Sequence, residues 1–387
     1  MTQPAADLYQ GQRHVATITR TGAGYRFDLV DDLVRDGLSS TLPAEKFPFE
    51  AAELHPFFLN LLPEGARLQL LLDTAKASDD TLDLLLRVGW DAIGDVAVVC
   101  HGESIQRESA QRVDDPSTVS FRELFADAAI RDASIAGVQD KLSDATIAFA
   151  VGNRAAGPSL LKLDPPRYPR LVHNEQFFLR VAASCGIDVN RATLIEDRDG
   201  EAGLLVTRFD RIRKGRSMIK LHQEDACQLL DLVPARKYRV SLREVAEAIQ
   251  AVASAPVVEC RRLLELYIFS YLIGNGDLHA KNISLLWREV VTLSPGYDLL
   301  STLPYPSLSR NMALPLEGKD ANFKPADFIA FGERCGVPAT ATRKISERLC
   351  RGIAPWLDRL DEIGYEEATT AALRAEMVDR IQRLTIS

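Results

Sequence analysis

The stretch from Gly274 to Ser284, GNGDLHAKNIS, places several polar side chains directly after an apolar segment. The preceding run, RLLELYIFSYLI (262–273), predicts a buried helix. An Asp, a His, a Lys and an Asn then occur within residues 277–282. Side chains of this kind are rarely buried alone, because an unpaired buried charge changes its pKa or lowers the stability of the fold. The stretch is therefore either a solvated turn or a functional site.

The segment after this stretch brings a further carboxylate into the same place. NISLLWREVVTLSPGYD (282–298) is strand-like on both sides of REV, which predicts a hairpin with REV at its turn. A hairpin returns its two ends to one another, so we expect Asp298 beside Asn282. Magnesium takes hard oxygen ligands, few of them from protein, and phosphoryl transfer needs another carboxylate to orient the attacking hydroxyl. Asp277, Asn282 and Asp298 together supply such a set.

Two upstream residues extend this pattern to a nucleotide site. SLLKLD (159–164) places Lys162 in a strand-like run, and Glu175 follows in a predicted helix. A strand Lys paired with a helix Glu is how the protein-kinase fold directs an ammonium group at ATP phosphates, and such kinases share the Asp-x4-Asn spacing. The sequence before Lys162 has no GxGxxG loop and no Walker A motif. The candidate segment over the phosphates is instead SIAGVQDKLS (134–143).

The composition limits the class of protein. The chain has 387 residues, 46% of them apolar, a formal net charge of -8 and a pI near 5.4. The acidic balance argues against free nucleic acid as the main ligand, although a local basic patch remains open. The six cysteines form no CxxC pair and no close Cys/His spacing, which argues against disulfides and zinc. The start has no apolar leader and no apolar run is long enough to span a bilayer, so we expect a cytoplasmic protein without membrane contact.

Hydrophobic periodicity predicts a small mixed unit at the start of the chain. HVATITRTGAGYRFDLV (14–30) predicts a hairpin with its turn at Gly22 and Gly24. PFFLNLLPEGARLQLLLD (56–73) predicts a helix. DTLDLLLRVGWDAIGDVAVVC (80–100) predicts a second helix that ends near Gly89 and returns to a strand.

A sheet and then a set of helices follow. Between residues 101 and 223, short β-like pieces surround one helix, HNEQFFLRVAASCG (173–186), and predict a mostly antiparallel sheet. From residue 224 onward, apolar residues recur at helical spacing, and ATRKISERLCRGIAPWLDRLDEIG (341–364) predicts one continuous helix. An irregular polar insertion over about 274–325 interrupts these helices. The pattern indicates a sheet-rich lobe followed by a helical lobe.

The ordered set of motifs resembles the HipA-like serine/threonine kinases, the toxins of bacterial type II toxin-antitoxin modules. The motifs are SIAGVQDK, LLKLD, HNEQFFL, TRFDR, HQEDACQLL, GNGDLHAKN and GYDLLS. FFLNLLPEG resembles the signature of the N-terminal subdomain of that family, so the similarity covers nearly the whole chain. It implies an α+β, protein-kinase-like two-lobed fold. Its parts are expected to be a small N-terminal α+β subdomain (1–105), a sheet-rich nucleotide-binding lobe (106–225) and an all-helical C-terminal lobe with the catalytic and metal-binding loops (226–387).

The resemblance also implies roles for the residues already singled out. Asp277 is expected to be the catalytic base, and Asn282 and Asp298 the magnesium ligands. Lys162 is expected to contact the ATP phosphates, held by Glu175.

Other positions are expected, by the same resemblance, around the nucleotide. The loop over the nucleotide corresponds to Ile135, Ala136, Gly137, Val138, Gln139 and Lys141. Ser134 opens this loop and matches a serine that can be autophosphorylated, which ejects the loop because its phosphate cannot share a pocket with ATP phosphates. TRFDR (207–211) is expected to be the hinge that meets adenine, although Thr207 stands where family members often have Glu. The remaining pocket residues are expected to be Phe209, Gln223, His279 and Tyr297.

The family resemblance implies partners as well. Its substrates include aminoacyl-tRNA synthetases, whose phosphorylation arrests growth. Its usual partner is a small helix-turn-helix antitoxin, HipB-like, through which the complex reaches DNA and represses its own operon.

Other interpretations remain open from the residues alone. Asp277 and Asn282 also suit a solvated turn, Lys162 an edge strand with its ammonium in water, and Ser134 a turn cap. His279 suits a loop-orienting hydrogen bond as well as a nucleotide contact. A small-molecule phosphotransferase of the aminoglycoside-kinase kind and a catalytically weak co-repressor acting with an antitoxin are the alternative functions.

Overall fold

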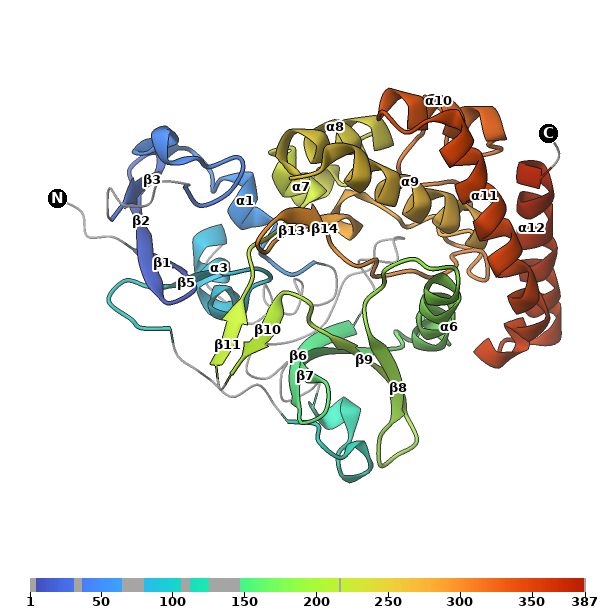
Figure 1. The fold of residues 1–387 in the computed structure, drawn as a ribbon. Helices are drawn as coiled ribbons and strands as arrows, with labels where there is room; N and C mark the ends of the chain where they lie inside the picture. Colours follow the sequence, from blue (N-terminus) through green and yellow to red (C-terminus); the bar gives the residue numbers. More distant parts are fainter. Residues whose placement is uncertain are drawn as a thin grey trace.

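The structure is a computed structural model that describes residues 5–30, 37–64, 80–105, 112–124, 147–215 and 217–385. An N-terminal sheet lies at one end of the molecule and helices α10 to α12 lie at the other (Figure 1). A second sheet with α6 lies between them, beside the helices that precede α10. No helix among the described residues is long and apolar enough to cross a membrane.

The N-terminal unit is a five-stranded antiparallel sheet in the order β4-β3-β2-β1-β5, with short helices against it. The predicted hairpin around Gly22 and Gly24 is confirmed, and so is the helix that ends near Gly89. The Asp80 side chain caps the start of that helix. The apolar core of the N-terminal unit includes Phe27, Phe57 and Phe58. The elements are β1 (Ala6–Gln10), β2 (Arg13–Thr21), β3 (Gly24–Leu29), η1 (Ala44–Lys46), β4 (Phe49–Ala51), α1 (Pro56–Leu59), α3 (Thr81–Val88), η2 (Gly89–Asp91) and β5 (Val96–Cys100).

The second sheet is antiparallel in the order β6-β7-β9-β8, which confirms the prediction for this region. Helix α6 packs against β8 and β9, where Val172 joins Leu204 and Val206 in a small apolar cluster. Gly186 follows α6 with φ +78°, the left-handed conformation that ends a helix. The elements are η3 (Pro116–Thr118), β6 (Ile147–Asn153), β7 (Gly157–Leu163), α6 (Leu171–Ser184), β8 (Ala192–Glu196) and β9 (Ala202–Thr207).

Two smaller sheets connect this lobe to the helices. One is the hairpin β10 (Arg211–Lys214) and β11 (Ser217–Lys220). The other joins β12 (Gln223–Asp225), β13 (Ser284–Trp287) and β14 (Val291–Leu293). Trp287 pairs with Val291 at its turn, so the hairpin predicted around REV is confirmed.

The other helices of the helical lobe pack around α9, whose side chains from Leu263 to Ile273 are all buried. Gly274 ends α9 at φ +72°, and a Cβ there would collide with the side chain of Leu303. The chain must therefore turn sharply just before the polar stretch. The elements are α7 (Ala226–Leu229), η4 (Pro234–Arg236), α8 (Leu242–Val252), α9 (Pro256–Ile273), η5 (Ala280–Asn282), α10 (Pro325–Arg334), α11 (Ala339–Ile353), η6 (Ala354–Ile363) and α12 (Glu367–Thr385).

Two predicted helices differ from the structure. The helix predicted over 56–73 is only the four-residue α1 within the described residues, since the chain leaves helical structure after Asn60 and Pro63 follows. The helix predicted over 341–364 ends at Ile353 and continues as η6, because Pro355 has no N–H with which to extend the α-helical ladder.

Candidate active site

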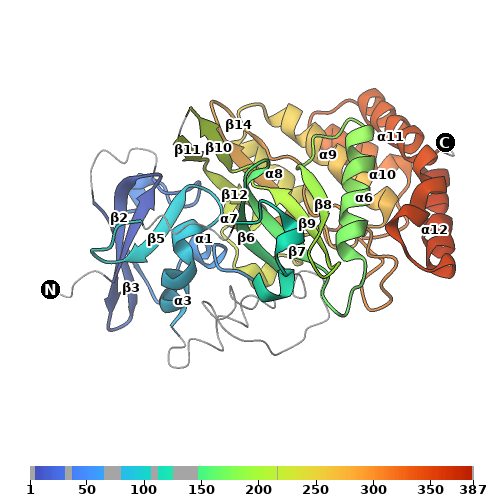
Figure 2. The ribbon, with the colours of Figure 1, turned by 90° about the horizontal axis from the view of Figure 1, so that it is seen from below.

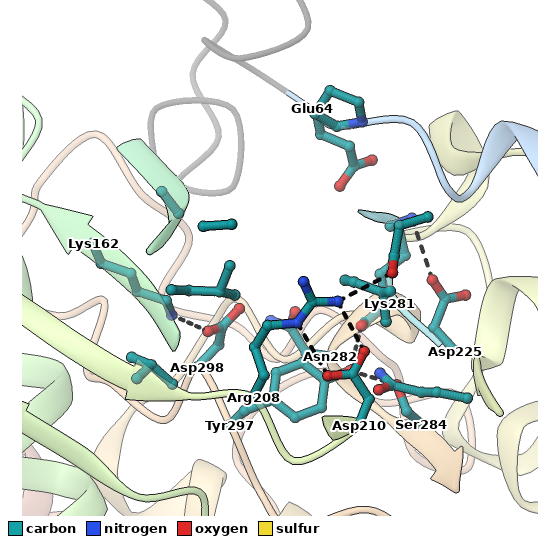
Figure 3. Close-up of a pocket in the computed structure, with 18 of the residues that line it drawn as sticks. Glu64, Lys162, Arg208, Asp210, Asp225, Lys281, Asn282, Ser284, Tyr297 and Asp298 are labelled. Atoms are coloured by element: carbon teal, nitrogen blue, oxygen red, sulfur yellow. Dashed lines mark hydrogen bonds and ion pairs between the residues drawn. The ribbon is translucent and has the colours of Figure 1, made fainter. Parts of the chain in front are cut away.

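A cavity of about 390 Å³ is lined by residues of the N-terminal unit, the second sheet and the helical lobe. These three parts of the chain adjoin one another in Figure 2. Residues from β7, α6, β9 and the loops after α9 and β14 line it, and 60–64 and 90–93 of the N-terminal unit lie on another side. Figure 3 shows charged and polar side chains directed into it from several elements. The polar stretch after α9 is therefore part of a cleft, not an exposed turn.

Lys162 is the central cation of this cavity. Its Nζ lies 2.8 Å and 2.9 Å from the two carboxylate oxygens of Glu175 on α6, and it also contacts Oδ1 of Asp298 (Figure 3). Burial lowers the pKa of Lys162, but the carboxylates of Asp298 and Glu175 outweigh burial and raise it above its usual value. The ammonium group therefore stays charged. Asn174, next to Glu175, exchanges two hydrogen bonds with the backbone of Ser301 (2.8 Å and 2.9 Å), which fixes α6 to the segment after Asp298.

The loop at Asp277 is fixed by its own hydrogen bonds. The Asp277 N–H donates to Oδ1 of Asn275 (3.1 Å), and its carbonyl accepts from the N–H of His279 (2.8 Å) and from Nδ2 of Asn282 (3.0 Å). The Tyr238 hydroxyl donates to Oδ1 of Asp277 (2.6 Å). Asp277 is thus an oriented carboxylate at the cavity, as a general base needs to be.

Tyr297 connects the two ends of the β13-β14 hairpin. Its hydroxyl lies 2.7 Å from both Oγ of Ser284 and the carbonyl of Lys281, and Nε2 of Gln223 donates to the same Ser284 hydroxyl (3.2 Å). The rings of Tyr297 and Phe209 lie 5.6 Å apart. Burial raises the pKa of Tyr297 well above its usual value, so its hydroxyl keeps its proton.

Asn282 and Asp298 suit a magnesium ion. Both line the cavity, and Asp298 adopts φ +54°, a conformation that few residues other than Gly accept. Nδ2 of Asn275 donates to the Asp298 carbonyl (3.3 Å) and helps to hold this conformation. The described part of the chain contains no cluster of three His, Cys, Asp or Glu side chains arranged for a metal ion. An amide and a carboxylate that line the same cavity fit magnesium, which takes few ligands from protein, better than they fit zinc.

Lys281 and Asp225 form a buried ion pair next to these groups, with Nζ and Oδ2 3.2 Å apart. Nζ of Lys281 also donates to the carbonyl (3.0 Å) and to Oδ1 (3.1 Å) of Asn60. Burial lowers the pKa of Lys281, but Asp225 and Glu64 outweigh burial and raise it. Lys281 therefore carries a charge whose partners come partly from the N-terminal unit.

The predicted hinge is held to the N-terminal unit by a second set of buried charges. Nη1 of Arg208 donates to Asp91 (2.8 Å) and Nη2 of Arg211 donates to the same carboxylate (2.9 Å). Both guanidinium groups also bind Asp210, which accepts from the N–H of Gly94 (2.9 Å). Burial raises the pKa of Asp210, but Arg208 and Arg211 outweigh it and hold the pKa below its usual value.

Most residues singled out in the sequence line this one cavity. They are Lys162, Glu175, Phe209, Gln223, Asp277, His279, Asn282, Tyr297 and Asp298. Ser134 and the predicted nucleotide-covering residues Ile135, Ala136, Gly137, Val138, Gln139 and Lys141 lie outside the described residues.

Sequence reasoning missed another group of cavity residues. Asn60, Glu64 and Asp91 belong to the N-terminal unit, and Lys281 was present in the polar stretch without an assigned role. The motif FFLNLLPEG contains Asn60 and Glu64, so the signal was present but gave no indication of what these side chains contact.

The chain matches known proteins over most of its length. Residues 6–99 match the family model of the HipA N-terminal domain, and residues 133–357 match that of the HipA-like C-terminal domain. The putative kinase Y4mE of Sinorhizobium fredii is 31% identical over 353 residues, which cover 84% of this chain and 82% of that protein. The serine/threonine-protein kinase toxin HipA of Shewanella oneidensis is 27% identical over 89% of this chain and 87% of that protein.

A solved structure shares the fold over nearly the whole chain. It is the Shewanella oneidensis complex of HipA, HipB and operator DNA, with a TM-score of 0.79 and 19% identity over 98% of this chain and 97% of the matched chain. The two-lobed, kinase-like α+β fold expected from the sequence is therefore confirmed, with β12, β13 and β14 as strands beside the otherwise helical lobe.

Proposed function

This chain belongs to the HipA family of serine/threonine-kinase toxins, and from that premise we propose that it transfers the γ-phosphate of ATP to a serine of a protein substrate, with magnesium. The observation that carries the proposal is the contact of Lys162 with both Glu175 and Asp298 at the cavity that Asp277 also lines. A cation held between a helix carboxylate and a loop carboxylate is the arrangement that positions ATP phosphates in protein kinases.

Asp277 is the proposed catalytic base. Its bonds to Tyr238 and Asn275 orient it, so that it can accept the proton of the attacking serine hydroxyl. Lys162 supplies positive charge toward the phosphates and is kept in place by Glu175. Asn282 and Asp298 are the proposed magnesium ligands, and the ion, when bound, neutralises charge on the transferring phosphate.

The nucleotide is proposed to occupy the cavity beside Phe209, Gln223, His279 and Tyr297. The backbone of the hinge, held by Arg208 and Arg211, then meets adenine. The segment from Ile135 to Lys141 is the proposed cover of the phosphates, and Ser134 the proposed autophosphorylation site. A phosphate on Ser134 would stop the enzyme by excluding that segment from the pocket, because the phosphoserine and the ATP phosphates both carry negative charge.

The proposed biological role is that of a growth-arresting toxin. Its protein substrate is proposed to be an aminoacyl-tRNA synthetase, and its partner a small helix-turn-helix antitoxin that carries the complex to DNA. Support for the partner comes from the solved relative, which is a complex of HipA with HipB and operator DNA. The division of the chain into 1–105, 106–225 and 226–387 is part of the same proposal.

The test is transfer of labelled phosphate from ATP to a panel of purified aminoacyl-tRNA synthetases, with an aminoglycoside as the competing acceptor. We expect label on one synthetase, none on the aminoglycoside, and none when the Asp277→Asn variant is used. Label on the aminoglycoside alone would contradict the proposal and identify a small-molecule phosphotransferase. No transfer at all, together with tighter operator binding by an antitoxin when the chain is added, would identify a co-repressor.

A further inference from the structure

We propose that Asn60 and Glu64 of the N-terminal unit are positioning residues that hold the loop 277–282 in its active geometry. The inference rests on the proposed function for the role of Asp277 and goes beyond it, because it makes the N-terminal unit part of the catalytic apparatus. Two independent connections run from the segment 60–64 to this loop.

The first connection ends on Lys281. Asn60 offers two oxygens to the same ammonium group, its carbonyl at 3.0 Å and its side-chain Oδ1 at 3.1 Å. Asp225 supplies the third contact at 3.2 Å. Lys281 directly precedes the proposed magnesium ligand Asn282, and its carbonyl accepts from Tyr297 (2.7 Å). Any displacement of Asn60 is therefore transmitted to the residue next to the metal site.

The second connection ends on Asp277. Oε2 of Glu64 lies 2.9 Å from Nζ of Lys237, whose side chain is only 5% exposed. The same ammonium group lies 5.5 Å from the ring centre of Tyr238, and the Tyr238 hydroxyl donates to Asp277 (2.6 Å). The carbonyl of Lys237 also accepts from the N–H of Ala280 inside the loop (3.2 Å). Glu64 thus fixes a cation that supports the loop through both backbone and side chain.

The segment that carries Asn60 and Glu64 is itself fixed to the helical lobe. Nδ2 of Asn60 donates to the carbonyl of Leu232 (2.8 Å), and Nε2 of Gln228 donates to the carbonyl of Phe57 (3.2 Å). Asn60, at one end of segment 60–64, is therefore bonded both to the helical lobe and to the loop, and Glu64, at the other end, is bonded to Lys237 beside the loop. This is what a positioning element requires, since a mobile segment could not define the place of Lys237 or Lys281.

The physical consequence concerns how often the loop opens. Removing one partner of a largely buried ion pair costs more than the pair itself contributed, because the remaining buried charge loses a hydrogen-bonded counter-charge. Hydrogen bonds to charged groups are the strong ones, so loss of one raises an opening equilibrium by about tenfold or more. We therefore expect Glu64→Gln to increase loop opening and to lower the turnover number, because fewer molecules hold Asp277 in place.

The experiment compares Glu64→Gln with the matched control Glu50→Gln in the same unit. Glu50 lies on β4, its side chain is 62% exposed, and it contacts Arg26 rather than the loop. Amide hydrogen exchange of residues 277–283 is measured on the full chain without nucleotide, and kcat and KM for ATP are measured in parallel. Lys237→Gln and the double variant complete a double-mutant cycle.

We expect loop exchange in Glu64→Gln to be about tenfold faster or more, and kcat to fall with KM for ATP nearly unchanged. Glu50→Gln should match the wild type in every measurement. The double variant should be less impaired than the sum of the two single variants, because both changes break the Glu64–Lys237 pair. An exchange rate in Glu64→Gln equal to the wild type, or additive effects in the cycle, would overturn the inference.

The exchange measurement separates this inference from the proposed function. If the wild type transfers no phosphate to any acceptor, the proposed function fails, and the exchange rates still decide whether Glu64 holds the loop. If the wild type is an active kinase and Glu64→Gln keeps both kcat and loop exchange, only the present inference fails.

Discussion

Raising the pH above 9 should weaken the contact between the N-terminal unit and the rest of the protein through His222. Nδ1 of His222 lies 2.7 Å from Asp95 of the N-terminal unit, and Nε2 lies 2.9 Å from Glu224. Glu224 also accepts from the N–H (2.7 Å) and the hydroxyl (2.6 Å) of Ser40. Burial lowers the pKa of His222, but the bonds to Asp95 and Glu224 outweigh burial and raise it to about 9.

The size of the loss in the free energy of unfolding follows from the difference between the folded and unfolded pKa of His222. The ordinary pKa is 6.5 and the folded value is about 9, so the folded state binds this proton more tightly. The stability gained is present in full below pH 6.5 and is lost as the pH rises through 9. At 1.36 kcal/mol for each pH unit, the loss approaches about 3 kcal/mol.

The assay is urea unfolding at pH 6.5 and pH 10, for the wild type and for His222→Gln. Other groups that titrate in this range act equally on both proteins, so the difference between them isolates His222. We expect the wild type to lose about 3 kcal/mol more than the variant over this interval. An NMR titration of the His222 ring gives the folded pKa directly. Equal losses in the two proteins, or a ring that titrates near 6.5, would show that the bonds of His222 to Asp95 and Glu224 do not stabilise the fold in this way.

Two further variants change other sites in the chain. Ser134→Ala should abolish self-phosphorylation and leave transfer to the protein substrate intact, as measured by mass spectrometry after incubation with ATP; label that persists in this variant would move the site elsewhere. Asp91→Ala should lower the free energy of unfolding by about 3 kcal/mol or more, because Arg208 and Arg211 lose a shared carboxylate in a buried place. Urea unfolding measures this effect, and a loss below about 1 kcal/mol, the scale of an exposed pair, would contradict it.

The sequence predicted those parts of the site whose residues are fixed by local structure. Lys162 on a strand and Glu175 on the next helix are 13 residues apart, and Asp298 is returned toward Asn282 by a hairpin with a recognisable turn. In each case hydrophobic periodicity and turn residues determine the geometry. The same signals located α9, because a long apolar run ending in Gly leaves few alternatives.

The remaining contacts depend on the packing of distant segments. Asn60 and Lys281 are 221 residues apart in the chain, and Arg208 and Asp91 are 117 apart. Hydrophobic periodicity does not relate positions so far apart in the chain. The sequence also does not distinguish an Asn or Asp that is buried in a contact from one that is exposed on the surface. The helix predicted over 56–73 illustrates the same limit, since its apolar spacing suited a helix while tertiary contacts use Asn60 and Glu64 in an irregular segment.

Phosphoryl transfer from ATP with Asp277 as the base is the core of the proposed function. The most direct measurement incubates the purified chain and its Asp277→Asn variant with labelled ATP, a purified synthetase panel and either magnesium or EDTA, and quantifies phosphoserine by mass spectrometry. We expect phosphoserine with the wild type and magnesium only, and a rate about 10² to 10⁴ times lower for the variant. Equal phosphoserine with wild type and Asp277→Asn, or transfer that continues in EDTA, would contradict it.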